Sequence, residues 1–321
     1  MVNDANWLLP EGVEEILPDE AIKLEMLRRS VLDDLASRGF NLVMPPVMEF
    51  VDALLTGTGE ELDTQTYKFM DQHTHRMLGI RADITPQIAR IDSHYLADLD
   101  VNKLCYAGTV LRTQPAHMGG QRELLQIGAE IFGVDDESAD LEIIQAMLQA
   151  LSLSRAADVT LSLGHVGIYR ALLNEQSVDG LLEQRLRDVL LRKSTPDLDA
   201  LSEQIDIAPF KVLLSLQGST DVLANAHKAF GHNQELADSL AQLETVVSEL
   251  KANKSAIKVH IDLADVAGYR YHTGLKYEAF VSGRGSAVAQ GGRYDRIGRL
   301  FGRGRAATGF SADLKTLVKL G

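Results

Sequence analysis

Apolar positions recur with a helical period near the start of the chain. Within residues 19–38, the apolar positions that share one helical face are Leu24, Leu27, Val31 and Leu35. Steps of three and four residues predict an amphipathic helix here. We expect Asp19, which follows a proline, to cap the first turn, and Gly39 to end the helix.

The apolar run that follows, residues 40–50, is broken by Pro45 and Pro46. Two adjacent prolines remove two backbone donors from a strand. This strand is therefore expected to lie at the edge of a sheet or to turn sharply at the prolines.

A hairpin and a helix are predicted next. Residues 66–81 have the pattern of two short strands joined by a turn over 71–74. Residues 83–91 have the pattern of a helix start, in which Thr85 can cap the free amides and Pro86 suits the first position.

Two kinds of periodicity alternate in the rest of the chain. A helix is predicted over 139–153 and a half-buried strand over 159–164. Strand alternation returns in 256–263 and continues through 276–283. In the first of these two strands the expected inward positions are Ile257, Val259, Ile261 and Leu263.

Residues 166–253 differ in composition from the rest of the chain. Leu, Glu, Asp, Ala and Ser dominate there at helical spacing, and runs of β-branched residues are few. This predicts a helical insertion within a core formed by residues 1–165 and 254–321. Strands that pair by hairpins, with helices between them, indicate an α+β fold with an antiparallel sheet flanked by helices.

The charge balance limits the possible partners. The 321-residue chain has 32 basic and 45 acidic side chains, a formal net charge of −13. Because nucleic-acid affinity comes largely from Lys and Arg at phosphates, an extensive nucleic-acid surface is disfavoured. The single cysteine, Cys105, excludes an internal disulfide and is expected to be a buried thiol.

The sequence contains no HxxxH or HExxH pair and neither of the glycine-rich nucleotide loops. We therefore expect no metal and no cofactor. The first residues lack a signal-peptide pattern, and no window approaches 18 apolar residues, which predicts a cytoplasmic protein without a membrane span.

A candidate pocket is carried by residues 104–133. They form a strand, a polar loop with Arg112 and Gln114, and a second strand with Gln126 and Glu130. Since side chains alternate along a strand, positions four apart face the same side. This layout is typical of a substrate pocket, although a buried structural network of the same residues would have the same pattern.

Several segments, taken in order, resemble the catalytic core of histidyl-tRNA synthetase, a class II aminoacyl-tRNA synthetase. The resemblance implies a class II sheet and a self-dimer formed through the first motif. The matching segments are 19–50 (first motif), 80–90 (the part that holds the amino group of histidine), 108–133 (second motif), 267–280 (histidine loop), and 291–302 with 307–317 (third motif region).

The same resemblance implies three arginines around the α-phosphate of ATP, because a bidentate, permanently charged group suits the transition state. Arg112 occupies the first position, but Ala267 and Thr316 stand at the other two, and Gln114 replaces the glutamate for adenine. Losing one such donor costs about 3–4 kcal/mol, so adenylation should be negligible. Lys315 is expected to point elsewhere and not to substitute for an arginine.

The part of the family's pocket that holds histidine itself is largely kept. The resemblance implies an acidic and hydroxyl pair for the ammonium, a glutamate for the imidazole N–H, and an arginine or backbone donors for the carboxylate. His272 stands where a tyrosine is usual, and a core histidine is the alternative interpretation. The expected histidine-binding residues are Asp83, Thr85, Arg112, Gln126, Glu130, Tyr271 and His272.

A chain whose pocket binds histidine without activating it resembles the family of regulatory subunits of ATP phosphoribosyltransferase. Residues 161–173 are similar to that family, and the chain ends at 321, where the synthetase continues into an anticodon-binding domain. The resemblance implies a non-catalytic subunit that activates a short-form catalytic subunit in the first step of histidine biosynthesis. It also implies feedback inhibition by L-histidine, a hetero-octamer with four copies of each subunit, and no tRNA binding.

Two other hypotheses are kept open by the sequence. One is an active amino-acid-activating enzyme whose catalytic groups have moved, for which histidine-dependent ATP–pyrophosphate exchange is diagnostic. The other is a stand-alone histidine sensor with a different partner.

Overall fold

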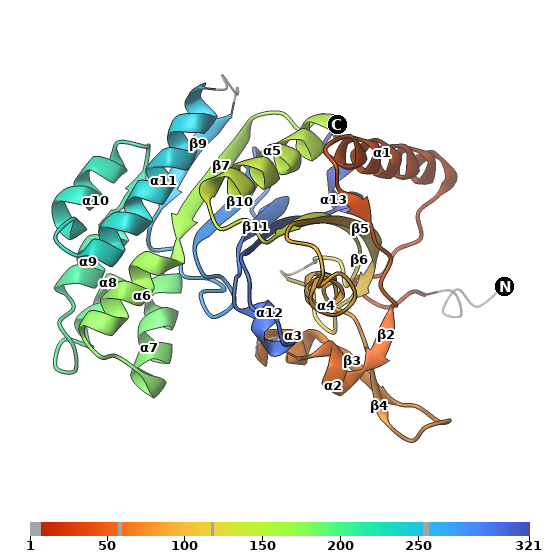
Figure 1. Ribbon diagram of the computed structural model, residues 1–321, viewed down its shortest axis with the longest axis horizontal. Helices are drawn as coiled ribbons and strands as arrows, with labels where there is room; N and C mark the ends of the chain where they lie inside the picture. Colours follow the sequence, from red (N-terminus) through yellow and green to blue (C-terminus); the bar gives the residue numbers. More distant parts are fainter. Residues whose placement is uncertain (1–7, 57–59, 117–118, 253–256) are drawn as a thin grey trace.

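A nine-stranded sheet runs through the centre of the computed structural model, which describes residues 8–56, 60–116, 119–252 and 257–321 (Figure 1). In spatial order its strands are β1 (Asn41–Leu42), β5 (Asn102–Leu111), β6 (Glu123–Phe132), β12 (Ala307–Asp313), β11 (Ala289–Arg293), β10 (Leu275–Val281), β7 (Val159–His165), β9 (Lys258–Asp262) and β8 (Gln217–Gly218). Six of the eight pairings between these strands are antiparallel, which confirms the predicted α+β character. The pairs β1–β5 and β7–β9 are parallel, because long crossover segments return the chain in the same direction.

A smaller sheet of β2 (Met48–Phe50), β4 (Met77–Ile80) and β3 (Tyr67–Met70) lies beside the large one. The predicted hairpin over 66–81 is confirmed, and Asp71 accepts the amides of His73 and Thr74 in its turn at 3.1 and 3.2 Å. Pro45 and Pro46 lie where the chain leaves edge strand β1 and enters β2 of the other sheet. The expected edge position of the strand that leads into the prolines is therefore confirmed.

One face of the large sheet is covered by α1 (Pro18–Ser37), α5 (Glu137–Leu153) and α13 (Leu314–Leu317). Helix α1 buries the four predicted apolar residues and ends before Gly39, whose φ is +86°. The prediction that Asp19 caps this helix is wrong. Leu17 holds the cap position without a side-chain bond, because Pro18 already occupies the first helical position and leaves Asp19 inside the first turn.

Six helices and strand β8 lie between β7 and β9. These helices are α6 (Val166–Glu175), α7 (Gly180–Leu191), α8 (Thr195–Asp199), α9 (Ala208–Ser215), α10 (Val222–Phe230) and α11 (Gln234–Ala252). Figure 1 shows them gathered at the β7–β9 end of the sheet. Their apolar side chains, such as Phe210 and Leu243, join the same hydrophobic cluster as Leu161 of the sheet. The expected end of the helical insertion, at residue 253, lies outside the described residues. The division of the chain into a core and an insertion therefore stays a prediction.

The opposite face of β5 and β6 carries α4 (Thr85–Tyr95) and, beside it, α12 (Ile297–Leu300), while α2 (Val51–Leu54) and α3 (Glu60–Gln65) flank the smaller sheet. The prediction that Thr85 caps α4 is wrong. Ile84 holds the cap position, and the Asp83 carboxylate accepts the Thr85 amide at 2.8 Å. The thiol of Cys105 is buried as expected, and burial raises its pKa to about 11.

Within the described ranges, no helix combines the length and the apolar character needed to cross a bilayer.

Candidate functional site

Gln126 and Glu130 face the same side of β6, as their spacing predicts, and both are buried. Glu130 lies directly opposite Gly309 on the neighbouring strand β12. A Cβ atom on Gly309 would overlap Oε2 of Glu130. The missing side chain of Gly309 therefore provides the space that the Glu130 carboxylate occupies.

Two tyrosine hydroxyls hold the Glu130 carboxylate. Tyr106 donates to Oε1 at 3.2 Å, and Tyr294 donates to Oε2 at 2.5 Å. Burial raises the pKa of Glu130 to about 8, although the hydrogen bond from Tyr294 acts in the opposite direction. Near neutral pH the group can therefore exchange a proton and can pair with either an N–H donor or a nitrogen acceptor.

Asp83 and Gln126 converge at the start of α4. Oδ1 of Asp83 accepts the amide of Thr85 at 2.8 Å and Nε2 of Gln126 at 3.2 Å, while Oε1 of Gln126 accepts the amide of Ile84 at 2.9 Å. The Thr85 hydroxyl lies 3.2 Å from that of Tyr106. The residues expected to hold an ammonium group are thus linked directly to the tyrosine that binds Glu130.

Tyr271 and His272 lie in the loop between β9 and β10. The ring of Tyr271 stacks on that of Tyr294 at a centroid distance of 5.3 Å. Burial, with the nearby carboxylates of Glu130 and Asp83, raises the pKa of Tyr271. The hydroxyl group of Tyr271 is therefore close enough to Glu130 and Asp83 to be affected by their charges.

His272 is neutral in this environment. Burial, with the charge of Lys276, lowers the pKa of its imidazole to about 4. Its ring packs edge-on against Tyr271 at 5.2 Å, and Nδ1 has no hydrogen-bond partner in the part of the chain that the structure describes. A Cβ atom on Gly292 would lie 2.8 Å from Nδ1, so the ring rests against β11.

Arg112 reaches the backbone of the Asp83 segment. Its Nε donates to the carbonyl of Ala82 at 3.3 Å, and its side chain is partly exposed. Gln114 is exposed in the loop that follows. Of the two polar residues predicted in this loop, Arg112 is therefore the one that adjoins the buried cluster.

Thr316 stands at one of the two positions where an arginine was expected. Its side chain takes part in the cap of a helix. Its hydroxyl donates to Oδ2 of Asp313 at 2.7 Å, within the cap of α13. The neighbouring Lys315 pairs with Glu123 at 3.0 Å. Glu123 is an odd number of positions from Gln126 and therefore faces the other side of β6. Lys315 thus points away from the pocket, as expected.

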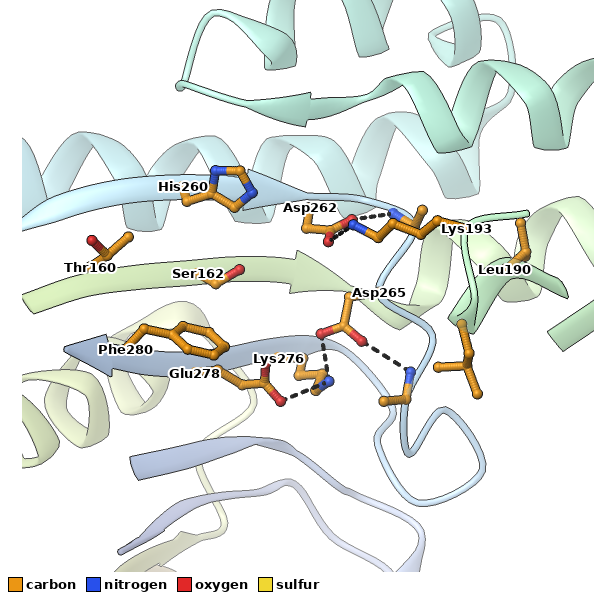
Figure 2. A pocket seen from close by; sticks show the side chains of 13 residues that line it. Thr160, Ser162, Leu190, Lys193, His260, Asp262, Asp265, Lys276, Glu278 and Phe280 are labelled. Carbon is orange, nitrogen blue, oxygen red and sulfur yellow. Dashed lines mark hydrogen bonds and ion pairs between the residues drawn. The ribbon is translucent and has the colours of Figure 1, made fainter. Parts of the chain in front are cut away.

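Ala267, at the other lost position, lines a pocket of about 530 Å³ over β7, β9 and β10 (Figure 2). Both lysines of this pocket are already paired. Lys193 lies 2.5 Å from Asp262, and Lys276 lies 2.5 Å from Asp265 and 3.2 Å from Glu278. Neither lysine supplies an uncompensated charge for a phosphate in place of the missing arginine.

The side chains identified from the sequence account for only part of the site. Tyr106 and Tyr294 make the direct contacts with Glu130, and the sequence patterns predict neither of them. Tyr106 lies opposite Gly128, midway between Gln126 and Glu130. Only the register of β5 against β6 brings it there, and the sequence does not specify that register. Within the described ranges, no group of three or more His, Cys, Asp or Glu side chains is arranged to hold a metal ion.

Comparison with known proteins agrees with this arrangement. The family model for histidyl-tRNA synthetase matches residues 12–317. The chain is 45% identical to an ATP phosphoribosyltransferase regulatory subunit from Methylococcus capsulatus, over 99% of this chain and 80% of that protein. A solved ATP phosphoribosyltransferase regulatory subunit/histidyl-tRNA synthetase from Bacillus halodurans has a TM-score of 0.88 and 26% identity, over 98% and 83% of the two chains. A chain of the ATP phosphoribosyl transferase (HisG:HisZ) complex from Thermotoga maritima shares the fold, with a TM-score of 0.71 and 20% identity over 91% and 97%.

Proposed function

The chain belongs to the family of ATP phosphoribosyltransferase regulatory subunits, and on this premise we propose that it regulates histidine biosynthesis by binding histidine without activating it. The observation that carries the proposal is a contrast within one site. The residues around Glu130, namely Asp83, Thr85, Tyr106, Gln126 and Tyr294, form a connected set that we call the Glu130 cluster. In contrast, the positions of two phosphate-binding arginines hold Ala267 and Thr316.

Histidine fits the polar groups of the cluster. Its imidazole N–H would donate to Glu130, and its ammonium would pair with Asp83, whose Oδ1 already orients Gln126 and the start of α4. Arg112 and nearby backbone amides would receive the carboxylate. Charge-assisted hydrogen bonds of this kind are about twice as strong as neutral ones and would give both affinity and orientation.

The partner in this proposal is the short-form catalytic subunit of ATP phosphoribosyltransferase. The names of the related proteins support it, as does the shared fold with a chain of the Thermotoga complex. We further propose a hetero-octamer with four copies of each subunit and a cytoplasmic location. In this assembly the present chain would contribute regulation alone, and catalysis would belong to the partner.

A self-dimer through residues 19–50 is part of the same assembly. A hollow of about 760 Å³ lies beside the Pro45–Pro46 segment. Met44, Met48 and Tyr95 expose 79%, 55% and 73% of their surface around it. Large exposed apolar side chains that gather in one place are typical of an interaction surface.

The regulation would be allosteric in the strict sense, with two sites coupled by a free energy. Histidine would bind preferentially to the state in which the catalytic partner is slow. A hundredfold preference corresponds to about 2.7 kcal/mol, which a few charge-assisted hydrogen bonds can supply.

The test is phosphoribosyl-ATP formation by a short-form catalytic subunit, with and without this chain, while histidine is titrated. Stimulation by the chain, reversed by histidine, is the expected result. A rate that neither the chain nor histidine changes would refute the proposal.

A further inference from the structure

The loop that carries Tyr271 and His272 has backbone amides that are bonded in short turns, but several of its carbonyl groups receive no backbone donor in the described part of the chain. It leaves β9 after Asp262 and enters β10 at Leu275. The amides of Tyr271 and His272 both use the carbonyl of Gly268, at 2.8 Å each. Among the described residues, no backbone amide donates to the carbonyl groups of Tyr269, His272 and Thr273, so these groups need donors from elsewhere.

Arg170, on α6 of the helical segment, supplies these donors. Its Nη2 donates to the carbonyls of Tyr269 and His272 at 3.0 and 2.9 Å, and its Nη1 donates to that of Thr273 at 3.2 Å. The three acceptors bracket Tyr271 on both sides. One guanidinium group therefore fixes the backbone before and after the tyrosine that stacks on Tyr294.

The residue that precedes it on α6 contacts the same loop. The ring of Tyr169 meets that of Tyr269 edge-on at 5.2 Å and that of Phe210, on α9, at 6.4 Å. Tyr269 is thus held by its ring and by its carbonyl from two consecutive residues of one helix. Through Phe210 this contact continues into the interior of the helical segment.

The bonding of Arg170 suits a role in positioning the loop. Within the described ranges it forms no ion pair with a carboxylate, and burial, together with the charge of Arg296, lowers its pKa. Its charge is therefore balanced mainly by carbonyl dipoles of the loop. A planar guanidinium can reach several acceptors in fixed directions, whereas a lysine ammonium on a flexible stem cannot reproduce this fork.

We propose that Arg170 is a positioning residue for histidine binding, through which the helical segment sets the conformation of the loop with Tyr271 and His272. The inference rests on the proposed function, since it assumes that this site binds histidine. Arg170 does not touch the ligand itself. It acts on Glu130 only through the loop, the Tyr271–Tyr294 stack and the Tyr294 hydroxyl.

The experiment compares the full chain with Arg170→Met and Arg170→Lys. The matched control is Arg185→Met, which removes an arginine of α7 outside the loop contacts. Two quantities are measured on each protein: hydrogen exchange of the Tyr271, His272 and Thr273 amides without ligand, and histidine affinity by calorimetry. We expect both Arg170 variants to exchange these amides at least tenfold faster and to bind histidine at least tenfold more weakly, while the control matches the parent chain.

Each outcome decides the proposal. Unchanged loop exchange and affinity in both Arg170 variants would overturn it and leave the proposed function standing. An equal rise of exchange throughout the sheet would also overturn it, because the arginine would then be a general stabilising residue. If Arg170→Met does not fold, Arg170→Lys decides, since it keeps the charge and most of the stem.

Failure of the proposed function gives a different pattern. The parent chain would then show no histidine binding at all. Loop exchange would still test Arg170, because a local increase in the variants supports positioning and its absence refutes it.

Discussion

Glu130 and Lys276 lie in one row across the nine-stranded sheet, and His272 stands over the row between them. The register runs from Glu130 to Gly309, then to Gly292 and to Lys276. Three strand spacings separate the ends by about 14 Å. Both intervening positions are glycines, and each leaves the space that a neighbouring side chain fills: the Glu130 carboxylate over Gly309 and the His272 ring over Gly292.

Replacing Glu130 by alanine should weaken inhibition by histidine and leave activation of the catalytic subunit largely intact. The ligand would lose the buried hydrogen-bond partner of its imidazole, a loss of about 1–3 kcal/mol, so the inhibition constant should rise roughly 5- to 150-fold. The measurement is a histidine titration of phosphoribosyl-ATP formation. Glu249→Ala, at an exposed position on α11, is the control. Equal loss of activation and inhibition would mean that Glu130 has a structural role.

The raised pKa of Glu130 should make stability depend on pH in a defined window. The unfolded carboxyl group ionises near its ordinary value of 4.5, whereas the folded group keeps its proton until about pH 8. The folded state binds more protons between these values, so its stability falls as pH rises, by at most about 1.4 kcal/mol per unit from this residue. Urea unfolding of the parent chain and of Glu130→Gln at pH 5, 6.5 and 8 measures this. The stability of the Glu130→Gln variant relative to the parent chain should grow with pH, and a constant difference would contradict the prediction.

Gly309→Ala should displace the Glu130 carboxylate, because the new methyl group would overlap Oε2. Overpacking of this kind costs about 1–3 kcal/mol of stability, and histidine affinity should fall more than tenfold. Gly285→Ala is the matched control, since a Cβ atom there meets no heavy atom within 4 Å. Calorimetry with histidine and urea unfolding give both quantities. Wild-type affinity in Gly309→Ala would mean that the carboxylate does not need its observed position.

The chain should not catalyse histidine-dependent ATP–pyrophosphate exchange. Ala267 and Thr316 leave two of three expected arginine positions without a cation, and the nearby Lys276 and Lys315 are already paired with carboxylates. Each missing donor corresponds to roughly 10²–10³ in rate. Radiolabelled pyrophosphate exchange with saturating histidine provides the measurement. Exchange above background would support the alternative of an active amino-acid-activating enzyme.

Met48→Glu should weaken the self-dimer, because it places a charge in the exposed apolar surface beside Pro45 and Pro46. An unpaired charge in such an interface costs several kcal/mol. Sedimentation velocity over a concentration series measures the shift toward monomer. Leu181→Glu, at a 73% exposed position of α7, is the control and should sediment like the parent chain. Unchanged association in Met48→Glu would place the interface elsewhere.

Local patterns predicted the elements of the fold more reliably than their ends. The apolar face of α1 follows directly from spacing, and the two prolines marked the change of sheet. Both predicted helix caps, Asp19 and Thr85, were wrong for related reasons. Each residue stands too far into its helix, and at α4 the neighbouring Asp83 accepts the free amide instead.

Features that depend on pairing between distant segments could not be predicted. The parallel pairs β1–β5 and β7–β9 require knowledge of where long crossovers return. The contacts of Tyr106 and Tyr294 with Glu130 depend on strand register across neighbouring strands, which periodicity within one strand does not encode. Whether the expected residues bind histidine stays a prediction, although Asp83 and Gln126 do converge.

The position of His272 has a consequence for ligand size. Its ring rests against Gly292, between the strand position of Glu130 and that of Lys276, which lines the pocket together with Ala267 and Asp265. We expect this uncharged side chain to limit how far a ligand held by Glu130 can extend toward that pocket. A histidine derivative that is extended on its imidazole ring should therefore be excluded by shape, before charge has any part in the choice.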